Sequence, residues 1–194
     1  MGLTGGLGAG KSEALRALGE LGAATLSTDA VVHELLAGDE LRDAVVARLG
    51  DEVAPGGKLD RSLIAERVFG DEEARAWLEG ELWPRVGQRV VEWRQEVEAL
   101  DPAPPAAVVE VPLLFESGME AAFDRTIAVV ADEEVRAERA GARGHASVAE
   151  RTGRQLSQEE KASRADFEVR NDGSLQELRE KLSRILARLD PPPP

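Results

Sequence analysis

Near its amino end the chain reads Leu3-Thr4-Gly5-Gly6-Leu7-Gly8-Ala9-Gly10-Lys11-Ser12. Gly5, Gly10, Lys11 and Ser12 complete the pattern G-x-x-x-x-G-K-[ST] of a phosphate-binding loop. Glycine adopts backbone conformations that other residues reach only at a cost, so successive N–H groups can curl around a phosphate. A helix that begins near Lys11 would direct its positive end at the same anion.

The residues that follow the loop support this interpretation. Ala14, Leu15, Leu18 and Leu21 have helical spacing, which supplies the loop-to-helix context that the motif requires. We expect the loop and the Lys11 ammonium to bind the phosphates of a nucleotide, and the Ser12 hydroxyl to ligate Mg²⁺. The predicted nucleotide-binding residues of the loop are Gly6, Leu7, Gly8, Ala9, Gly10, Lys11 and Ser12. The alternative is a glycine-rich turn that matches the pattern by accident.

The composition is that of a globular, acidic protein. The 194 residues are 42% hydrophobic and carry a formal net charge of −13, without a cysteine. The sequence has no apolar run long enough to cross a membrane and no signal peptide. The acidic charge argues against nucleic acid as the main partner. We expect a cytoplasmic enzyme with no nucleic-acid or membrane partner, present as a monomer or a small homo-oligomer.

Short β-rich runs alternate with helical patterns, which is typical of an α/β fold. We predict a three-layer fold of the P-loop NTPase type, with a mainly parallel five-stranded sheet, an inserted helical lobe and a lid. The predicted strands are residues 2–4, 23–27, 106–111, 126–131 and 167–170. The predicted helices are residues 11–21, 29–37, 40–49, 61–69, 72–100, 133–142, 147–155, 158–165 and 175–189.

Several local signals refine these boundaries. Ser157 with Glu160, and Ser174 with Glu177, form the capping-box pattern at the start of a helix. Pro84 predicts a break in the helix at residues 72–100. The first strand is short for a phosphate-loop fold, so we expect the natural chain to begin further upstream. Trp77, Trp83 and Trp93 are expected in the core of the helical lobe or in a pocket wall.

Two residues near the end of the second strand are candidates for chemistry. Asp29 would lie at the carboxyl edge of the sheet, where it could orient or deprotonate an acceptor hydroxyl, or hold Mg²⁺ through water. The alternative is an N-cap for the next helix. His33 follows Asp29 by one turn and could contact it, but a solvent-facing histidine is the favoured interpretation.

Two further acids lie at the end of the third strand and shortly after it. Glu110 could hold Mg²⁺ through water, as the second carboxylate of phosphate-loop enzymes does, or it could turn to solvent. Glu116 could belong to an acceptor pocket or to the surface, and the sequence does not decide between them.

Cations are concentrated between the fourth and fifth strands. Arginine suits phosphate oxygens, so two or three of these residues could stabilise transferred charge from a flap. The alternative is a solvated helical surface with ion pairs to neighbouring glutamates. The cluster consists of Arg136, Arg139, Arg143, Arg151, Arg154, Lys161 and Arg164.

Taken in order, these segments resemble the dephospho-CoA kinase family over nearly the whole chain. The phosphate loop resembles the family's L-T-G-G-I-G-S-G-K-S, and Leu26-Ser27-Thr28-Asp29 stands where the family has I-D-A-D. Further matching segments are Leu59-Asp60-Arg61, Val68-Phe69, Pro112-Leu113-Leu114-Phe115-Glu116, Glu138-Arg139-Ala140-Gly141-Ala142-Arg143, Arg151 through Gln155, Glu159-Glu160-Lys161, Ala165-Asp166-Phe167 and Asn171-Asp172-Gly173-Ser174.

The resemblance implies ATP-dependent phosphorylation of the ribose 3′-hydroxyl of dephospho-CoA, with Mg²⁺, to give CoA and ADP. It implies catalytic roles for Lys11, Asp29 and Arg139, with nucleotide contacts from Glu133, Arg139 and Arg143. It also implies a nucleotide-binding core, a helical acceptor lobe and a lid. These regions are residues 1–29 with 106–135 and 166–190, residues 30–100 and residues 136–165. The four final prolines, residues 191–194, have no core to join and predict a disordered tail.

The chain departs from the family pattern at three positions. Ser27 replaces the first acid of D-A-D, Trp83 replaces the histidine of a His-Pro pair, and Glu110 replaces a common aspartate. Another small-metabolite or nucleoside monophosphate kinase, or a nucleotide-binding module without catalysis, remains as an alternative. A GTPase is disfavoured because the guanine-binding and switch motifs are absent.

Overall fold

The computed structural model describes residues 1–142 and 155–189 and divides the chain into two compact units. The first unit is Met1–Ser27 with Glu96–Pro194, and the second is Thr28–Gln95. The second unit therefore interrupts the first in sequence. The predicted helix at residues 147–155 lies largely outside the described residues, and the tail at residues 191–194 lies wholly outside them.

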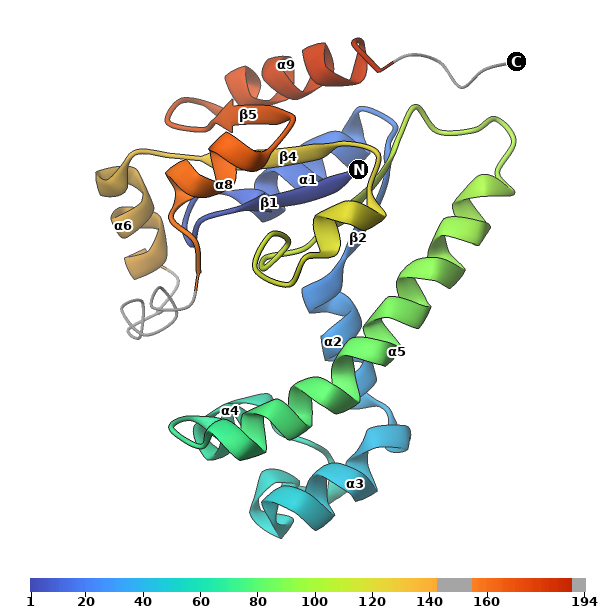
Figure 1. Ribbon diagram of the computed structural model, residues 1–194, viewed down its shortest axis with the longest axis vertical. Coiled ribbons are helices and arrows are strands. Elements are labelled where there is room, and N and C mark those ends of the chain that lie inside the picture. The colour runs from blue at the N-terminus through green and yellow to red at the C-terminus, as the bar shows by residue number, and fades with distance from the viewer. Residues whose placement is uncertain (143–154, 190–194) are drawn as a thin grey trace. The chain divides into compact units, whose positions relative to one another are not determined.

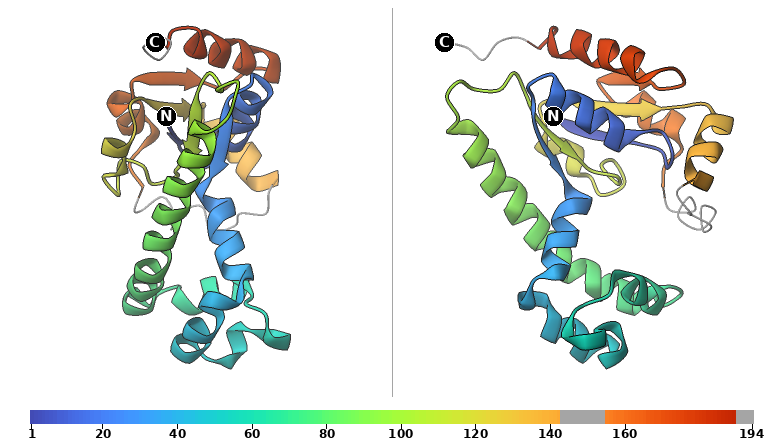
Figure 2. Two further views of the ribbon diagram at one scale, coloured as in Figure 1. Left: turned by 90° about the vertical axis from the view of Figure 1, so that its right-hand side faces the viewer. Right: turned by 180° about the vertical axis from the view of Figure 1, so that it is seen from behind.

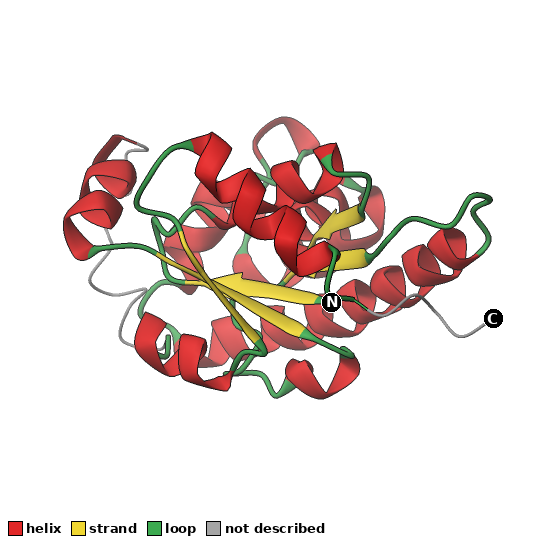
Figure 3. Cartoon of the chain, turned by 90° about the horizontal axis from the view of Figure 1, so that it is seen from above, coloured by secondary structure: helices red, strands yellow, loops and turns green. Residues whose placement is uncertain are grey.

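The described part of the first unit contains a five-stranded sheet in the order β2-β3-β1-β4-β5 (Figure 1). Each neighbouring pair of strands is parallel, which confirms the predicted α/β class. Figure 3 shows successive strands crossing at an angle, as the twist of a parallel sheet requires. The strands are β1 (Gly2–Gly5), β2 (Ala24–Ser27), β3 (Ala107–Glu110), β4 (Thr126–Val130) and β5 (Phe167–Arg170).

Strand β1 is short but occupies the centre of the sheet. All four of its residues are buried, and it pairs with β3 on one side and β4 on the other. Gly2 pairs with Val109 and with Thr126, so the strand is in register with both neighbours. The phosphate-binding loop therefore begins at the carboxyl end of the central strand, where ligands bind in open parallel sheets.

Helices cover both faces of this sheet. α1 (Lys11–Glu20) packs against α9 (Leu175–Leu186) and against β1, β2 and β3, whereas α8 (Gln158–Arg164) packs against β4, β1 and β5. α8 lies in front of the sheet in Figure 1, and α1 lies in front of it in the rear view of Figure 2. Leu3, Leu18, Ile127 and Leu182 are completely buried in the core on the α1 and α9 face. The predicted three layers are present.

Capping boxes fix the starts of α8 and α9, as predicted. The Ser157 hydroxyl accepts from the Glu160 N–H, and the Glu160 carboxylate accepts from the Ser157 N–H. The main-chain N–H of Ser157, and to a lesser extent its hydroxyl, stabilise the Glu160 carboxylate and lower the pKa of Glu160. Ser174 and Glu177 make the same reciprocal pair at α9.

A carboxylate anchors the start of β5. One oxygen of Asp166 accepts from both the N–H and the hydroxyl of Thr126, each at 2.8 Å. Burial raises the pKa of Asp166, but the bonds from Thr126 outweigh that effect and the pKa is lowered. This anchor fixes the amino end of β5 to the amino end of β4.

The second unit is helical. Its core contains Leu41, Val45, Val53, Ile64 and Leu78. Asp60 caps the third of its helices by accepting from the N–H groups of Ser62 and Leu63. The elements are α2 (Thr28–Ala37), α3 (Asp39–Leu49), the 3-10 turns η1 (Asp51–Val53) and η2 (Pro55–Gly57), α4 (Arg61–Val68) and α5 (Glu72–Glu98), whose last residues belong to the first unit.

The predicted break at Pro84 is wrong, because α5 continues through this residue. Proline removes the hydrogen bond to the carbonyl of Gly80, at a cost of about 3 kcal/mol. The turns before and after Pro84 remain helical, and the Arg85 guanidinium donates to the Glu81 carbonyl at 2.6 Å.

The three tryptophans of the second unit differ in burial. Trp93 is buried and Trp77 packs on the core, but Trp83 is 40% exposed.

A buried lysine attaches α8 to the loop that follows β3. Lys161 is completely buried, and its ammonium donates to the Pro112 carbonyl at 2.7 Å and pairs with Glu116 at 3.0 Å. Glu116 also accepts from the Leu156 N–H, and Pro112 accepts from the Thr4 hydroxyl. The interpretation of Lys161 as a solvated surface residue is therefore wrong.

Lys161→Met should lower the free energy of unfolding by about 3–5 kcal/mol, because it leaves the Glu116 carboxylate buried without its cation. Urea denaturation measures this change. Lys161→Met combined with Glu116→Leu should recover part of the loss. Arg164→Met, at an exposed position on the same helix, is the control and should change the stability by less than about 0.5 kcal/mol. Equal effects of Lys161→Met and Arg164→Met would contradict the role of the buried pair.

Candidate active site

The phosphate-binding loop requires the backbone of glycine at Gly8 and Gly10, as well as at Gly5 where the loop begins. Gly8 and Gly10 have φ values of 76° and 94°. A Cβ atom on Gly8 would lie 2.5 Å from the Arg136 carbonyl oxygen, and one on Gly10 would lie 2.2 Å from the Asn171 amide nitrogen. Both glycines are therefore required for conformation and for space.

The carbonyl groups of the loop are held by hydrogen bonds from outside and within it. The Lys11 ammonium donates to Gly5 and Gly6, each at 3.1 Å. The Arg136 guanidinium donates to Leu7, and the Asn171 amide donates to Ala9, each at 2.9 Å. In a trans peptide the C=O and the following N–H point in opposite directions. These contacts therefore orient the N–H groups of the next residues, which are Gly6, Leu7, Gly8 and Gly10.

Helix α1 begins directly after this loop. Gly10 is its N-cap and has no side chain with which to cap it. Lys11 is half-buried and Ser12 is exposed, so the hydroxyl of Ser12 is accessible at the helix start. A helix N-terminus preceded by oriented N–H groups is an anion-binding arrangement.

Two arginines of α6 (Glu133–Ala142) lie against the loop. Arg136 donates to Leu7 as described, and the Arg139 guanidinium donates to the main-chain oxygen of Asn171 at 2.9 Å. Glu133 is exposed in the first turn of the same helix. Arg143, Arg151 and Arg154 lie outside the described residues. The structure thus brings Arg136 to the loop and Arg139 to Asn171 beside Gly10, whereas none of the described hydrogen bonds or ion pairs joins Glu133 to the loop.

The acid of β3 is buried. Glu110 is 4% exposed and pairs in register with Leu3 of β1 and Ser27 of β2. The alternative of a solvent-facing Glu110 is therefore wrong. Among the described residues, no group of three or more His, Asp or Glu side chains could hold a metal ion by itself.

Asp29 and His33 belong to the second unit. Asp29 is exposed in the first turn of α2, which begins at Thr28, so it is not the N-cap residue of that helix. It lies two residues after the end of β2. His33 is exposed, which agrees with the favoured interpretation of a solvent-facing histidine. Its Nδ1 atom lies 3.2 Å from the Arg61 guanidinium.

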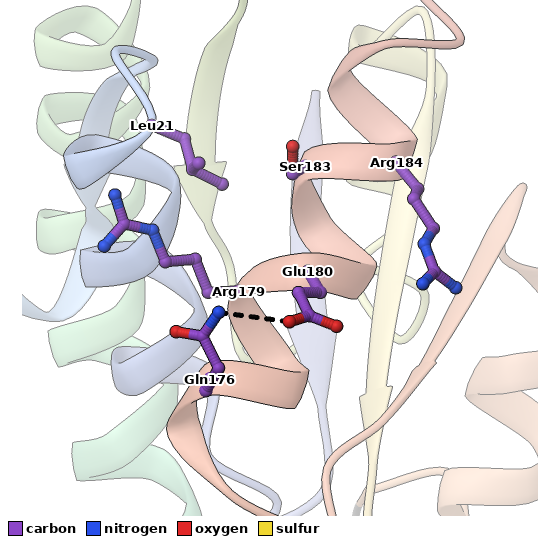
Figure 4. A pocket seen from close by; sticks show the side chains of 6 residues that line it. All are labelled: Leu21, Gln176, Arg179, Glu180, Ser183 and Arg184. Carbon is purple, nitrogen blue, oxygen red and sulfur yellow. Dashed lines mark hydrogen bonds between the residues drawn. The ribbon is translucent and has the colours of Figure 1, made fainter.

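A pocket of about 320 Å³ lies on the outer side of α9 (Figure 4). Gln176, Arg179, Glu180, Ser183 and Arg184 line it from α9, and Leu21 lines it from the end of α1. None of these residues belongs to the phosphate-binding loop. Gln176 donates to Glu180 at 3.1 Å, and Arg179 pairs with Glu20 at 3.7 Å. Acidic and basic groups are mixed there, so this pocket is a poor candidate for a polyphosphate.

Comparison with known proteins decides the family to which this loop belongs. A family model described as dephospho-CoA kinase matches residues 1–177. The chain belongs to the dephospho-CoA kinase family.

Individual members of the family are similar over nearly their whole length. The dephospho-CoA kinase of Protochlamydia amoebophila is 40% identical over 191 residues, which cover 96% of this chain and 94% of that protein. The dephospho-CoA kinase of Deinococcus radiodurans is 38% identical over 201 residues, covering 98% and 92%. Relatives of this similarity confirm the resemblance that the sequence motifs indicated.

Two solved structures share the fold. TT1252 from Thermus thermophilus has a TM-score of 0.81 and 34% identity, covering 98% of this chain and 97% of that chain. The dephospho-CoA kinase from Campylobacter jejuni has a TM-score of 0.68 and 26% identity, covering 96% and 94%. The expected P-loop kinase architecture is thereby confirmed.

One residue that contacts the loop had no predicted role. Asn171 is 4% exposed, and its amide contacts Ala9. It lies in the family segment Asn171-Asp172-Gly173-Ser174, directly after β5. The available signal in the sequence was a polar residue at the carboxyl end of a strand. Its partner Ala9 could not be predicted, because it lies 162 positions away in the sequence.

Lys11→Ala should lower kcat by at least about 100-fold and leave the fold intact, because the predicted role of the ammonium is to stabilise charge on the transferred phosphoryl group. Steady-state kinetics and circular dichroism measure the two effects. Lys181→Ala is a matched control, since the Lys181 ammonium also donates to a main-chain carbonyl, that of Arg170, at 2.7 Å. A kcat within about threefold of wild type for Lys11→Ala would contradict this assignment.

Proposed function

We propose that the chain transfers the γ-phosphoryl group of ATP to the 3′-hydroxyl of the ribose of dephospho-CoA, giving CoA and ADP. The protein is a kinase of the dephospho-CoA kinase family, and ATP-dependent phosphorylation of dephospho-CoA is the reaction of that family. The observation that carries the proposal is the loop at residues 5–12, whose oriented N–H groups lead into the start of α1. Such a loop suits a triphosphate.

The loop would contribute to catalysis by positioning the triphosphate and by stabilising its negative charge. Phosphoryl transfer requires little covalent chemistry from the protein, so catalysis depends on alignment and on stabilising the phosphoryl oxygens. We assign the triphosphate to the N–H groups of residues 6–12 and the negative charge of the transferred group to Lys11. Arg139, next to Gly10 and Asn171, would stabilise the same charge from α6. Glu133 and Arg143 stay predicted nucleotide contacts.

Mg²⁺ is the proposed cofactor, and the oxygen donors present are consistent with it. Mg²⁺ prefers oxygen ligands and commonly uses one or two protein side chains together with substrate phosphates and water. Ser12 supplies an accessible hydroxyl at the start of α1, and Glu110 or Asp29 could contribute through water. When bound, the ion would neutralise phosphate charge.

Asp29 is the proposed group for the acceptor hydroxyl. Its carboxylate is exposed, and it follows β2, whose carboxyl end belongs to the edge of the sheet where the loop also begins. It would orient the 3′-hydroxyl or accept its proton during transfer. Because Ser27 stands where the family commonly has an acid, this chain relies on one carboxylate at this position.

The remaining assignments extend the same proposal. The helical second unit would bind dephospho-CoA. Of the lid predicted at residues 136–165, the part before α8 would act as the lid over ATP, because α8 packs on the sheet. No helix in the described part of the chain is long and apolar enough to span a membrane. We propose a cytoplasmic enzyme that is a monomer or a small homo-oligomer and does not use nucleic acid as a partner, consistent with its net charge of −13.

ADP formation should depend on both dephospho-CoA and a divalent cation. Chromatography of the nucleotides should show steady ADP release with ATP, Mg²⁺ and dephospho-CoA, and only background release when dephospho-CoA is omitted or EDTA is added. A panel of nucleoside monophosphates and sugars serves as the specificity control. Turnover of a panel member without turnover of dephospho-CoA would select another small-metabolite kinase, and ATP binding with no ADP from any acceptor would select a non-catalytic module.

Asp29→Asn should lower kcat by about 10²–10⁴-fold while leaving the KM for ATP nearly unchanged, because it removes the proton acceptor but not a phosphate contact. Asp39→Asn is the matched control, since Asp39 is also exposed in the first turn of a helix of the second unit. Its kcat should be that of the wild type. If Asp29→Asn turned over as fast as Asp39→Asn, Asp29 would have no role in proton transfer.

A further inference from the structure

Asn171 lies where two strands and the phosphate-binding loop meet. It follows β5 directly, and its main-chain N–H donates to the Val130 carbonyl at 2.8 Å, which continues the pairing of β5 with β4. Its side chain is 4% exposed. The backbone of Asn171 is therefore fixed by the sheet, and its amide has little room to move.

The amide of Asn171 contacts the loop through a main-chain carbonyl. Its nitrogen donates to the Ala9 carbonyl at 2.9 Å in a buried hydrogen bond. It also fills the space next to Gly10, where a Cβ atom would lie 2.2 Å from the same nitrogen. Gly10 is thus glycine partly because Asn171 occupies the place that a side chain would need.

The hydrogen bond to the Ala9 carbonyl also fixes the direction of the Gly10 N–H. The carbonyl of Ala9 and the N–H of Gly10 belong to one trans peptide and point in opposite directions. When Asn171 fixes the carbonyl outward, the N–H of Gly10 is fixed toward the inner side of the loop. Arg139 donates to the main-chain oxygen of Asn171 at 2.9 Å, so the same residue also receives an arginine of α6.

We propose that Asn171 is a positioning residue for phosphoryl transfer, whose buried amide turns the Ala9–Gly10 peptide so that the Gly10 N–H faces the phosphates of ATP. The residue acts through the loop and does not need to touch the nucleotide to do so. The inference rests on the proposed function, because it assumes that the loop binds ATP.

Asn171→Asp tests this role with almost no change in volume. An ionised carboxylate cannot donate to the Ala9 carbonyl and repels it, so at pH 8 the Kd for ATP, measured by isothermal titration calorimetry without acceptor, should rise about tenfold or more. The KM for dephospho-CoA should stay within about twofold of wild type. When the pH is lowered, protonation restores an O–H donor, and the ratio of mutant to wild-type Kd should fall. Asn171→Leu has no donor at any pH and should show no such recovery.

Asp166→Asn is the matched control for loss of stability. Asp166 anchors the opposite end of β5 through Thr126 and has no contact with the loop among the described hydrogen bonds. This substitution should lower the melting temperature but leave the Kd for ATP within about twofold of wild type. If Asn171→Asp does not fold, Asn171→Ser replaces it in the test. The shorter serine side chain does not reach the Ala9 carbonyl, so its Kd for ATP should be several-fold higher than that of the wild type.

The outcomes separate the inference from the function on which it rests. Failure of the wild-type protein to bind ATP would overturn the proposed function itself. Wild-type ATP affinity in folded Asn171→Asp and Asn171→Leu would overturn only the positioning role. Loss of affinity in Asp166→Asn equal to that in Asn171→Asp would also overturn it, since the effect would then follow the stability of β5. Weaker ATP binding by Asn171→Asp at pH 8, with recovery at lower pH, would support the positioning role.

Discussion

The orientation of a few peptide groups between β1 and α1 is the constraint on which the site depends. A loop can present several N–H groups to one anion only if the carbonyls of the same peptides have partners elsewhere. Here the carbonyls of Gly5 and Gly6 accept from Lys11, that of Leu7 from Arg136 and that of Ala9 from Asn171. Contacts within the protein therefore orient the N–H groups of the loop.

The order of the sheet makes these partners available. Because β1 lies between β3 and β4, its loop opens at the centre of the edge, and the residues that follow β4 and β5 reach it. Arg136 comes from the helix after β4, and Asn171 comes directly after β5. On the other side, Pro112 after β3 receives both the Thr4 hydroxyl and the buried Lys161 ammonium. Elements distant in sequence thus hold the backbone at the carboxyl end of β1 from both sides.

The sequence was sufficient where the determinant is local, and insufficient where it is a tertiary contact. The loop motif, the two capping boxes and the five strands all follow from short patterns, and each was predicted. Pro84 was mistaken for a break because a single residue's preference is weaker than the helical turns on either side of it. Lys161 and Asn171 were misjudged or missed because their partners, Glu116 and Ala9, come from other parts of the chain.

A crystal structure of the full chain with a non-hydrolysable ATP analogue tests the central claim most directly. The β- and γ-phosphate oxygens should lie about 3 Å from main-chain nitrogens of residues 6–12. The Ala9 carbonyl should still accept from Asn171 in that complex. A triphosphate bound elsewhere on the protein, with no phosphate at the start of α1, would contradict the account.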